Sequence, residues 1–169
     1  MKLSHICKLL TAAALAFAST QQAFAGEMTE GVQVTVSKRP FRGGTVRYSY
    51  TVSNMSGSPI TTIQLGYDHL HGVAEFTTPP YRWVFGKPVS RAVVGGPANW
   101  IPFVVPTEGT PYFDVEWVRN PKKAPLPSGR SAGGFSILIR GEDAKYETAH
   151  WRVVLQDGTV RVGIIQPAP

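Results

Sequence analysis

The sequence predicts an all-β fold, an antiparallel two-sheet sandwich of about eight short strands, with an open barrel as the alternative. Two observations lead to this prediction. Apolar side chains recur at every second position in short runs, as in strands with one buried face. Glycine, proline or asparagine separates one run from the next, which is typical of a sandwich. Residues 142–148 are expected to form one helical turn, and no longer helical pattern is visible.

The first 25 residues have the three-part pattern of a secretory signal peptide. Lys2 and Lys8 precede an apolar run at 9–18, and a small-residue site, Ala-Phe-Ala, ends at Ala25. The run is shorter than the roughly 20 residues that span a membrane. We therefore expect cleavage after Ala25. Residues 26–169 would then form a single domain without a membrane anchor, secreted or periplasmic.

Composition narrows the possible partners. The 17 Lys and Arg residues against 11 Asp and Glu give a net charge of +6, and removal of Lys2 and Lys8 leaves +4. No nucleic-acid-binding motif accompanies this mild charge, so no nucleic-acid partner is predicted. The one cysteine, Cys7, lies within the predicted signal peptide. The exported domain is therefore expected to fold without a disulfide.

The first predicted strands surround one long segment, 45–67. Val32, Val34 and Val36 alternate with polar residues and form a first strand, which is expected to end in a loop at 38–44. In the segment itself, apolar alternation runs to Val52, breaks at the turn-forming residues 53–59, and resumes. We expect its two halves to pair as a hairpin through that break.

The middle of the chain has weaker patterns. Residues 81–85 alternate and predict a short strand, and 89–94 can form another. Residues 99–106 are apolar but contain prolines, which predicts an edge strand or a packed loop. The next strand is expected at 113–117, with Asp114 and Glu116 on its solvated side.

The C-terminal third has the clearest signals. Residues 120–134 are rich in proline and glycine and are expected to be a long connection, followed by a strand at 135–139. Two alternating runs, 151–155 and 160–164, flank Asp157-Gly158. This pair favours a hairpin with a type I′ turn, because both residues accept positive φ.

Several stretches resemble bacterial secreted immunoglobulin-like and fibronectin type III-like modules. They are the strand end at 48–54 with the turn at 57–60, and the approach 126–129 leading into the core strand at 134–136. This resemblance implies a β-sandwich architecture. It implies no catalytic residues.

One cluster has the composition of a metal site. His69, His71 and Glu75 form an H-x-H-x-x-x-E pattern, in which two histidines two residues apart share one face of a strand. The pattern resembles the first metal motif of cupins and implies, as the alternative reading, a metal-dependent enzyme that holds a divalent ion. The framing glycines and the later histidine of cupins are missing.

The main reading is a non-catalytic interaction module without a cofactor, binding a polysaccharide or an envelope protein. Exposed aromatic rings can stack on sugars. Tyr81, Trp100 and Tyr112 lie near proline-rich loops and are the predicted ligand-binding residues. The sequence does not determine the oligomeric state.

Overall fold

The computed structural model describes residues 30–169. The predicted signal peptide at 1–25, with Cys7, lies outside the described residues. Residues 30–169 contain no cysteine, so no disulfide joins any part of this range. Within the same range, no helix is long and apolar enough to cross a membrane.

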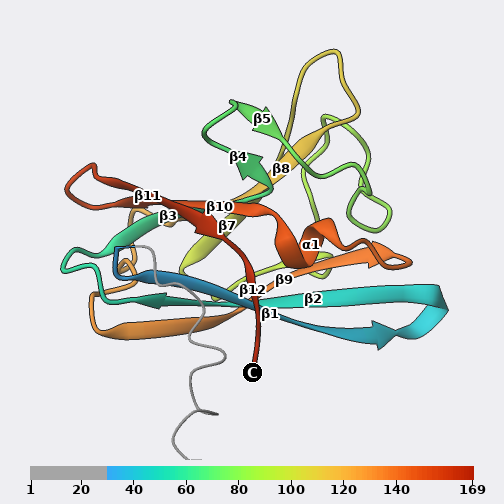
Figure 1. Cartoon of the computed structure of the whole chain (residues 1–169). Helices are drawn as coiled ribbons and strands as arrows, with labels where there is room; N and C mark the ends of the chain where they lie inside the picture. Colours follow the sequence, from blue (N-terminus) through green and yellow to red (C-terminus); the bar gives the residue numbers. More distant parts are fainter. Residues whose placement is uncertain (1–29) are drawn as a thin grey trace, which may run out of the picture.

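The regular secondary structure of the described chain is almost entirely β-strand (Figure 1). Its first half contains β1 (Val32–Phe41), a 3-10 turn (Arg42–Gly44), β2 (Thr45–Asn54), β3 (Ile60–Leu65), β4 (Tyr67–Asp68), β5 (Val73–Ala74) and β6 (Val94–Gly95). Its second half contains β7 (Trp100–Pro106), β8 (Phe113–Arg119), β9 (Arg130–Arg140), α1 (Lys145–Thr148), β10 (His150–Leu155), β11 (Val160–Ile164) and β12 (Gln166–Pro167). The predicted helical turn is confirmed as α1.

Two five-stranded sheets lie face to face, one below the other in Figure 1. Sheet A has the strand order β12-β1-β2-β9-β6, and sheet B has the order β11-β10-β3-β8-β7. All neighbours are antiparallel except β1 and β12. A small β4–β5 hairpin rises from sheet B. The predicted immunoglobulin-like, two-sheet antiparallel sandwich is confirmed, with twelve strands that include several of two residues.

The core forms where the alternating apolar faces of the two sheets meet. Tyr48 and Tyr50 of β2 are buried from sheet A, and Trp117 of β8 and Trp151 of β10 from sheet B. Between them, the ring of Phe135 lies edge-on to Trp117, with ring centroids 5.6 Å apart. Burial of large aromatic surfaces of this kind dominates the stability of a domain that has no covalent cross-link.

The predicted hairpin at 45–67 is wrong. Its halves, β2 and β3, lie in opposite sheets, and the break at 53–59 carries the chain across the sandwich. Both edges of β2 are occupied, by β1 in register from Val32↔Asn54 to Phe41↔Thr45 and by β9 on the other side. The prediction placed the apolar faces on the same core correctly, but an alternating pattern does not specify which strand is the hydrogen-bonded partner.

The loop predicted at 38–44 is also mostly strand. β1 continues through Pro40 to Phe41 and turns into β2 at Arg42–Gly44, so the true N-terminal hairpin is β1–β2. Proline is tolerated there because β12 pairs with β1 only near Thr35 and Val36, and leaves the rest of that edge unpaired. Similarly, β9 begins at Arg130, inside the predicted connection at 120–134.

Of the strands predicted between residues 81 and 106, one is confirmed and the others are mostly loop. Residues 81–85 form turns instead of a strand, and only Val94–Gly95 is extended from the segment 89–94. The edge strand at 99–106 is confirmed as β7, which pairs with β8 alone.

The C-terminal hairpin β10–β11 is confirmed, in register from His150↔Ile164 to Val154↔Val160. Its turn is not type I′, because Gly158 has a φ of +85° while Asp157 does not have a positive φ. Hydrogen bonds from Leu155 N to Thr159 O and from Gly158 N to Leu155 O close a longer loop with glycine at the left-handed position.

Candidate functional site

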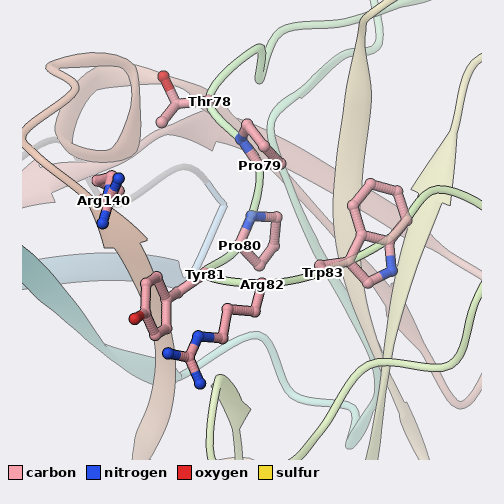
Figure 2. A pocket seen from close by; sticks show the side chains of 7 residues that line it. All are labelled: Thr78, Pro79, Pro80, Tyr81, Arg82, Trp83 and Arg140. Carbon is pink, nitrogen blue, oxygen red and sulfur yellow. The ribbon is translucent and has the colours of Figure 1, made fainter.

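A hollow of about 550 Å³ opens beside the end of β9. One continuous segment and one strand residue line it: Thr78, Pro79, Pro80, Tyr81, Arg82, Trp83 and Arg140. Figure 2 shows Tyr81 and Arg140 on one side of Pro80 and Trp83 on the other. Two guanidinium groups and two large aromatic rings therefore surround a space of ligand size.

Backbone contacts fix this segment to sheet A. Pro80 forms an isolated bridge with Ile139 of β9, and Tyr81 N donates to Leu138 O at 2.7 Å. Trp83 N then turns back to donate to Pro80 O at 2.9 Å. The two prolines restrict φ on the approach to Tyr81. The aromatic side chains are thus carried on a rigid loop and not on a regular strand.

Arg82 has an unusual backbone conformation. Its φ is +59°, and among residues 30–169 the only other non-glycine residue with a positive φ is Glu30. This region disfavours a bulky side chain, and such strain is concentrated at functional positions. The conformation carries the Arg82 Cζ to 5.0 Å from the centre of the Tyr81 ring. Charge and aromatic surface are therefore presented together.

The hollow lies at one end of a basic surface, the outer face of sheet A. Register places Phe41, Thr45 and Arg140 in one row across the sheet, and Arg39, Arg47 and Leu138 in the next. The strands β1, β2 and β9 contain no Asp or Glu. The Arg47 Cζ lies 4.8 Å from the centre of the Phe41 ring. Anionic groups would meet no repulsive charge on this face.

The guanidinium of Arg140 has no hydrogen-bond or ion-pair partner among residues 30–169, since each ion pair there involves other residues. By contrast, Lys38 on β1 is engaged, with its Nζ 3.0 Å from Glu142 and 2.8 Å from Glu147. Arg140 is therefore available to a carboxylate or sulfate group, which it can bind with two parallel hydrogen bonds.

A buried tyrosine supports the start of the lining segment. The Tyr146 hydroxyl of α1 donates to Thr78 O at 2.6 Å, and the Tyr146 ring stacks on Phe76 with centroids 4.2 Å apart. Tyr50 in turn donates its hydroxyl to Tyr146 O at 2.9 Å. Burial raises the pKa of Tyr146 well above its ordinary value, so its hydroxyl stays protonated and donating. The core thus holds the loop in place.

Replacing Tyr146 with phenylalanine is expected to lower the free energy of unfolding by about 1–3 kcal/mol, because Thr78 O loses its donor inside the protein. Urea unfolding at pH 7 measures this change. Tyr112→Phe is the matched control: Tyr112 is 44% exposed, and its hydroxyl has no bonded partner among the described residues. Equal stability of the two variants would contradict the supporting role of Tyr146.

The structure separates the three predicted ligand-binding residues. Tyr81 lines the hollow, and its role in ligand binding stays a prediction. Trp100 does not: it is 1% exposed, and its ring lies edge-on to Phe135 at 5.5 Å, so its prediction as a contact residue is corrected. Tyr112 is exposed on the loop between β7 and β8 and is not one of the residues that line the hollow.

The predicted metal ligands are engaged in different contacts. His71 Nδ1 lies 2.6 Å from Asp68 Oδ2. Glu75 accepts from Lys145 Nζ at 2.9 Å and from His150 N at 2.7 Å. Burial raises the Glu75 pKa, but these donors outweigh it and hold the pKa below its ordinary value.

Within residues 30–169, no three His, Cys, Asp or Glu side chains are grouped so as to hold a metal ion. His69 has a ring contact with Tyr67, with centroids 6.5 Å apart. The structure gives no support to the cupin-like alternative.

The acidic residues of β8 also differ from expectation. Asp114 is 3% exposed, although it lies on the outer face, and it accepts from Gln64 Nε2 at 2.8 Å. Burial raises the pKa of Asp114 to about 6 and also raises that of half-buried Glu116. The solvated face predicted for Asp114 is therefore wrong.

Sequence reasoning missed Arg82 and Arg140 in the hollow. The run Tyr81-Arg82-Trp83 directly after two prolines was the available signal for the first. Arg140 gives no such signal, since only the pairing of Pro80 with Ile139 brings it to the segment.

Comparison with protein-family models and with curated proteins gave no match. Among solved structures, the chain is similar to an uncharacterized protein from Nocardia farcinica whose crystal structure reveals an immunoglobulin-like fold. The identity is 18% and the TM-score 0.49, over 77% of this chain and 82% of that one. It is also similar to a GH20 exo-β-N-acetylglucosaminidase from Vibrio harveyi, at 12% identity and a TM-score of 0.43, over 82% of this chain. The matched region spans only 18% of that enzyme. At these identities the likeness concerns the fold alone.

Proposed function

We propose that this chain is an exported, non-catalytic β-sandwich module that binds an acidic polysaccharide in the hollow beside β9. One observation carries the proposal. The guanidinium of Arg140, unpartnered among residues 30–169, lies with Arg82, Tyr81 and Trp83 around one space that no acidic side chain lines.

The chemistry of these groups matches that of a sugar acid. Aromatic rings pack against the apolar faces of sugar rings, and Tyr81 and Trp83 supply such surfaces. A planar guanidinium binds a carboxylate or a sulfate through two parallel hydrogen bonds. The basic rows of sheet A extend the same charge past Arg140 to Arg47 and Arg39, along which a polymer can continue.

Binding rather than catalysis is favoured by the lining itself. It contains no carboxyl, imidazole or thiol group to act as a general acid, base or nucleophile. The one carboxyl whose pKa is raised to about 6, Asp114, belongs to sheet B, on the opposite side of the sandwich. The proposed function requires no cofactor.

The location remains part of the proposal. It rests on the signal-peptide pattern of residues 1–25, which delivers the domain to the periplasm or the medium. Acidic polysaccharides are accessible to a protein in either place.

Titration calorimetry tests the proposal with three polymers: polygalacturonate supplies carboxylates, dextran sulfate supplies sulfates, and dextran is the uncharged control. We expect binding to at least one acidic polymer and none to dextran. Arg140→Ala and Tyr81→Ala should each weaken binding about tenfold or more, as loss of a charged hydrogen bond or a stacked ring implies. The affinity should also fall with added salt.

Two matched variants serve as controls. Arg130→Ala removes an arginine from the opposite end of β9, and Tyr112→Ala removes an exposed ring outside the hollow. Both should bind within about twofold of the wild type, since a surface side chain outside the contact contributes little. Absence of binding to both acidic polymers, or an equal loss in Arg130→Ala, would overturn the proposal.

A further inference from the structure

The outer face of sheet B is unusually apolar. Its first row, read across β11, β10, β3, β8 and β7, contains Val160, Val154, Thr62, Val118 and Ile101. These residues alternate with the buried core positions, so they point away from sheet A. The outward side of an antiparallel sheet is ordinarily polar. Here four of the five residues in the row are β-branched hydrocarbons.

The residues at the ends of the second and third rows are also apolar. Val162 and Phe103 flank the second row, while Ile164 and Val105 flank the third. Three of these four side chains are exposed: Phe103 by 46%, Ile164 by 50% and Val105 by 38%. A contiguous apolar surface of this kind marks an interaction site. Sheet A differs, because its outer face carries arginine and hydroxyl side chains.

Polar groups occupy the centre of the second row, in the order Arg152, Gln64, Glu116. His150 and Asp114 follow in the third row. Arg152 donates one bond, to Gln64 Oε1 at 3.3 Å, and its buried Nε has no partner in the described part of the chain. The carboxylate of Glu116 accepts no hydrogen bond from any of residues 30–169. One cation and one anion thus stand on either side of Gln64, each with unused hydrogen-bonding capacity.

This arrangement is self-complementary. Consider a two-fold axis that lies between two facing copies and runs parallel to β3. It places Arg152 of one copy opposite Glu116 of the other, twice over, and brings Gln64 opposite its own copy. Val162 then faces Phe103, and Ile164 faces Val105, so apolar flanks meet apolar flanks. An isologous interface requires such a match of one surface with itself.

We propose that a second copy of this chain covers the outer face of sheet B and forms a two-fold symmetric dimer. The unused donors of Arg152 and the carboxylate of Glu116 pair across the interface, where a surrounding apolar rim excludes water. The acidic-polysaccharide hollow lies on sheet A, so it stays open in this dimer. The dimer would present two hollows on opposite outer sides.

The size of the face sets the expected strength. Five strands about 4.8 Å apart and three outward rows about 6.8 Å apart form a face of roughly 24 by 20 Å. Because side chains make the face uneven, its accessible surface is larger than its flat area. The two copies together would bury roughly 1,200 Å², which is the lower end of the range for specific interfaces. The β4–β5 hairpin stands beyond the third-row end of β3 (Figure 1). We therefore expect a dissociation constant in the micromolar range.

Sedimentation velocity over a concentration series, up to about 500 µM to cover that range, tests the dimer. The wild type should pass from monomer to dimer. Arg152→Glu places two acids opposite each other, and Glu116→Arg places two arginines opposite each other. Each variant should therefore raise the dissociation constant about tenfold or more.

The decisive measurement mixes these two variants. In the mixture, the two arginines of the Glu116→Arg variant face the two acids of the Arg152→Glu variant. A heterodimer should therefore form, although each variant alone is monomeric. A purely structural effect of either substitution would not be restored by mixing. Ser49→Glu on sheet A is the control and should dimerise as the wild type does.

A wild type that is monomeric over the whole series would overturn the dimer. So would retention of the dimer in both charge variants, or a mixture that stays monomeric while circular dichroism shows both variants folded. Polysaccharide binding is measured separately on sheet A, so either proposal can fail without the other.

Discussion

Replacing Gly66 with alanine is expected to lower the free energy of unfolding by about 3 kcal/mol, with reasons in both backbone and packing. Gly66 has a φ of +78°, which costs an L-residue about 1–2 kcal/mol. A Cβ atom there would overlap the Cδ2 and Cε2 atoms of Phe76. Phe76 is fully buried and stacked on Tyr146, so it cannot move aside. Overpacking adds about 1–3 kcal/mol.

Gly57→Ala separates the two contributions. Gly57 has a φ of +85°, but apart from its two chain neighbours none of the described residues comes within 4 Å of the added Cβ. This control should therefore show only the backbone cost, about 1–2 kcal/mol. Chemical denaturation of both variants gives the comparison. If Gly66→Ala were no less stable than Gly57→Ala, the close packing of Phe76 on Gly66 would be refuted.

The Gly66 variant should also affect the hollow. Phe76 stacks on Tyr146, and Tyr146 donates to Thr78 O, so displacement of the Phe76 ring disturbs the start of the lining segment. A loss of polysaccharide affinity in Gly66→Ala but not in Gly57→Ala would accompany the loss of stability.

Asp114→Asn is expected to be more stable than the wild type at pH 7.5 and to lose that advantage toward pH 4. Burial raises the pKa of Asp114 from 3.8 to about 6. The folded state therefore binds a proton that the unfolded chain has already released between these values. The contribution of Asp114 to stability is complete below pH 3.8 and is lost as the pH rises through 6.

The size of this effect follows from the shift. A rise of about two units in the pKa of Asp114 on folding corresponds to about 3 kcal/mol of folding free energy. Asparagine keeps an oxygen for the bond from Gln64 Nε2 but lacks the charge that burial disfavours. The bond from Gln64 to a neutral amide oxygen is weaker than its bond to a carboxylate. The net gain in stability at pH 7.5 should therefore be about 1–3 kcal/mol. Unfolding by urea at several pH values, at protein concentrations below the expected dimer range, measures it.

Asp157→Asn should have the opposite pH dependence. The backbone N–H of Thr159 lowers the pKa of Asp157, so its contribution is present above the unfolded pKa and is lost as the pH falls. The difference between each variant and the wild type isolates one carboxyl from the others. A pH-independent difference for Asp114→Asn would show that its carboxyl is not buried as described.

The sequence predicted the inward faces well because alternation reports burial directly. Val46, Tyr48, Tyr50 and Val52 were expected on one apolar face, and all four are buried. Alternation does not show which strands are hydrogen-bonded to each other. The residues 53–59 suit a hairpin turn and a crossing between sheets equally well, and only competition for the edges of β2 decides between them.

Of the residues that line the hollow, the sequence analysis singled out only Tyr81. Tyr81 was identified because an aromatic ring beside prolines tends to be loop-borne. The same reasoning failed for Trp100, since the proline-containing edge strand β7 has an inward face that packs on Phe135. The prediction that Asp114 is solvated was also wrong. Its position on the strand faces outward, but neighbouring side chains cover it.

The sequence by itself determined the fold class, the absence of a disulfide in residues 30–169, the β10–β11 hairpin and the inward faces of β1, β2, β3, β8, β9 and β10. These properties depend on the order of neighbouring residues, which the chain carries locally. Only the tertiary structure decided which strands pair, that Arg140 joins Tyr81 and Arg82, and that Arg152 and Glu116 flank Gln64. Each of these depends on segments distant in sequence, and their contact is set by the packing of the whole sandwich.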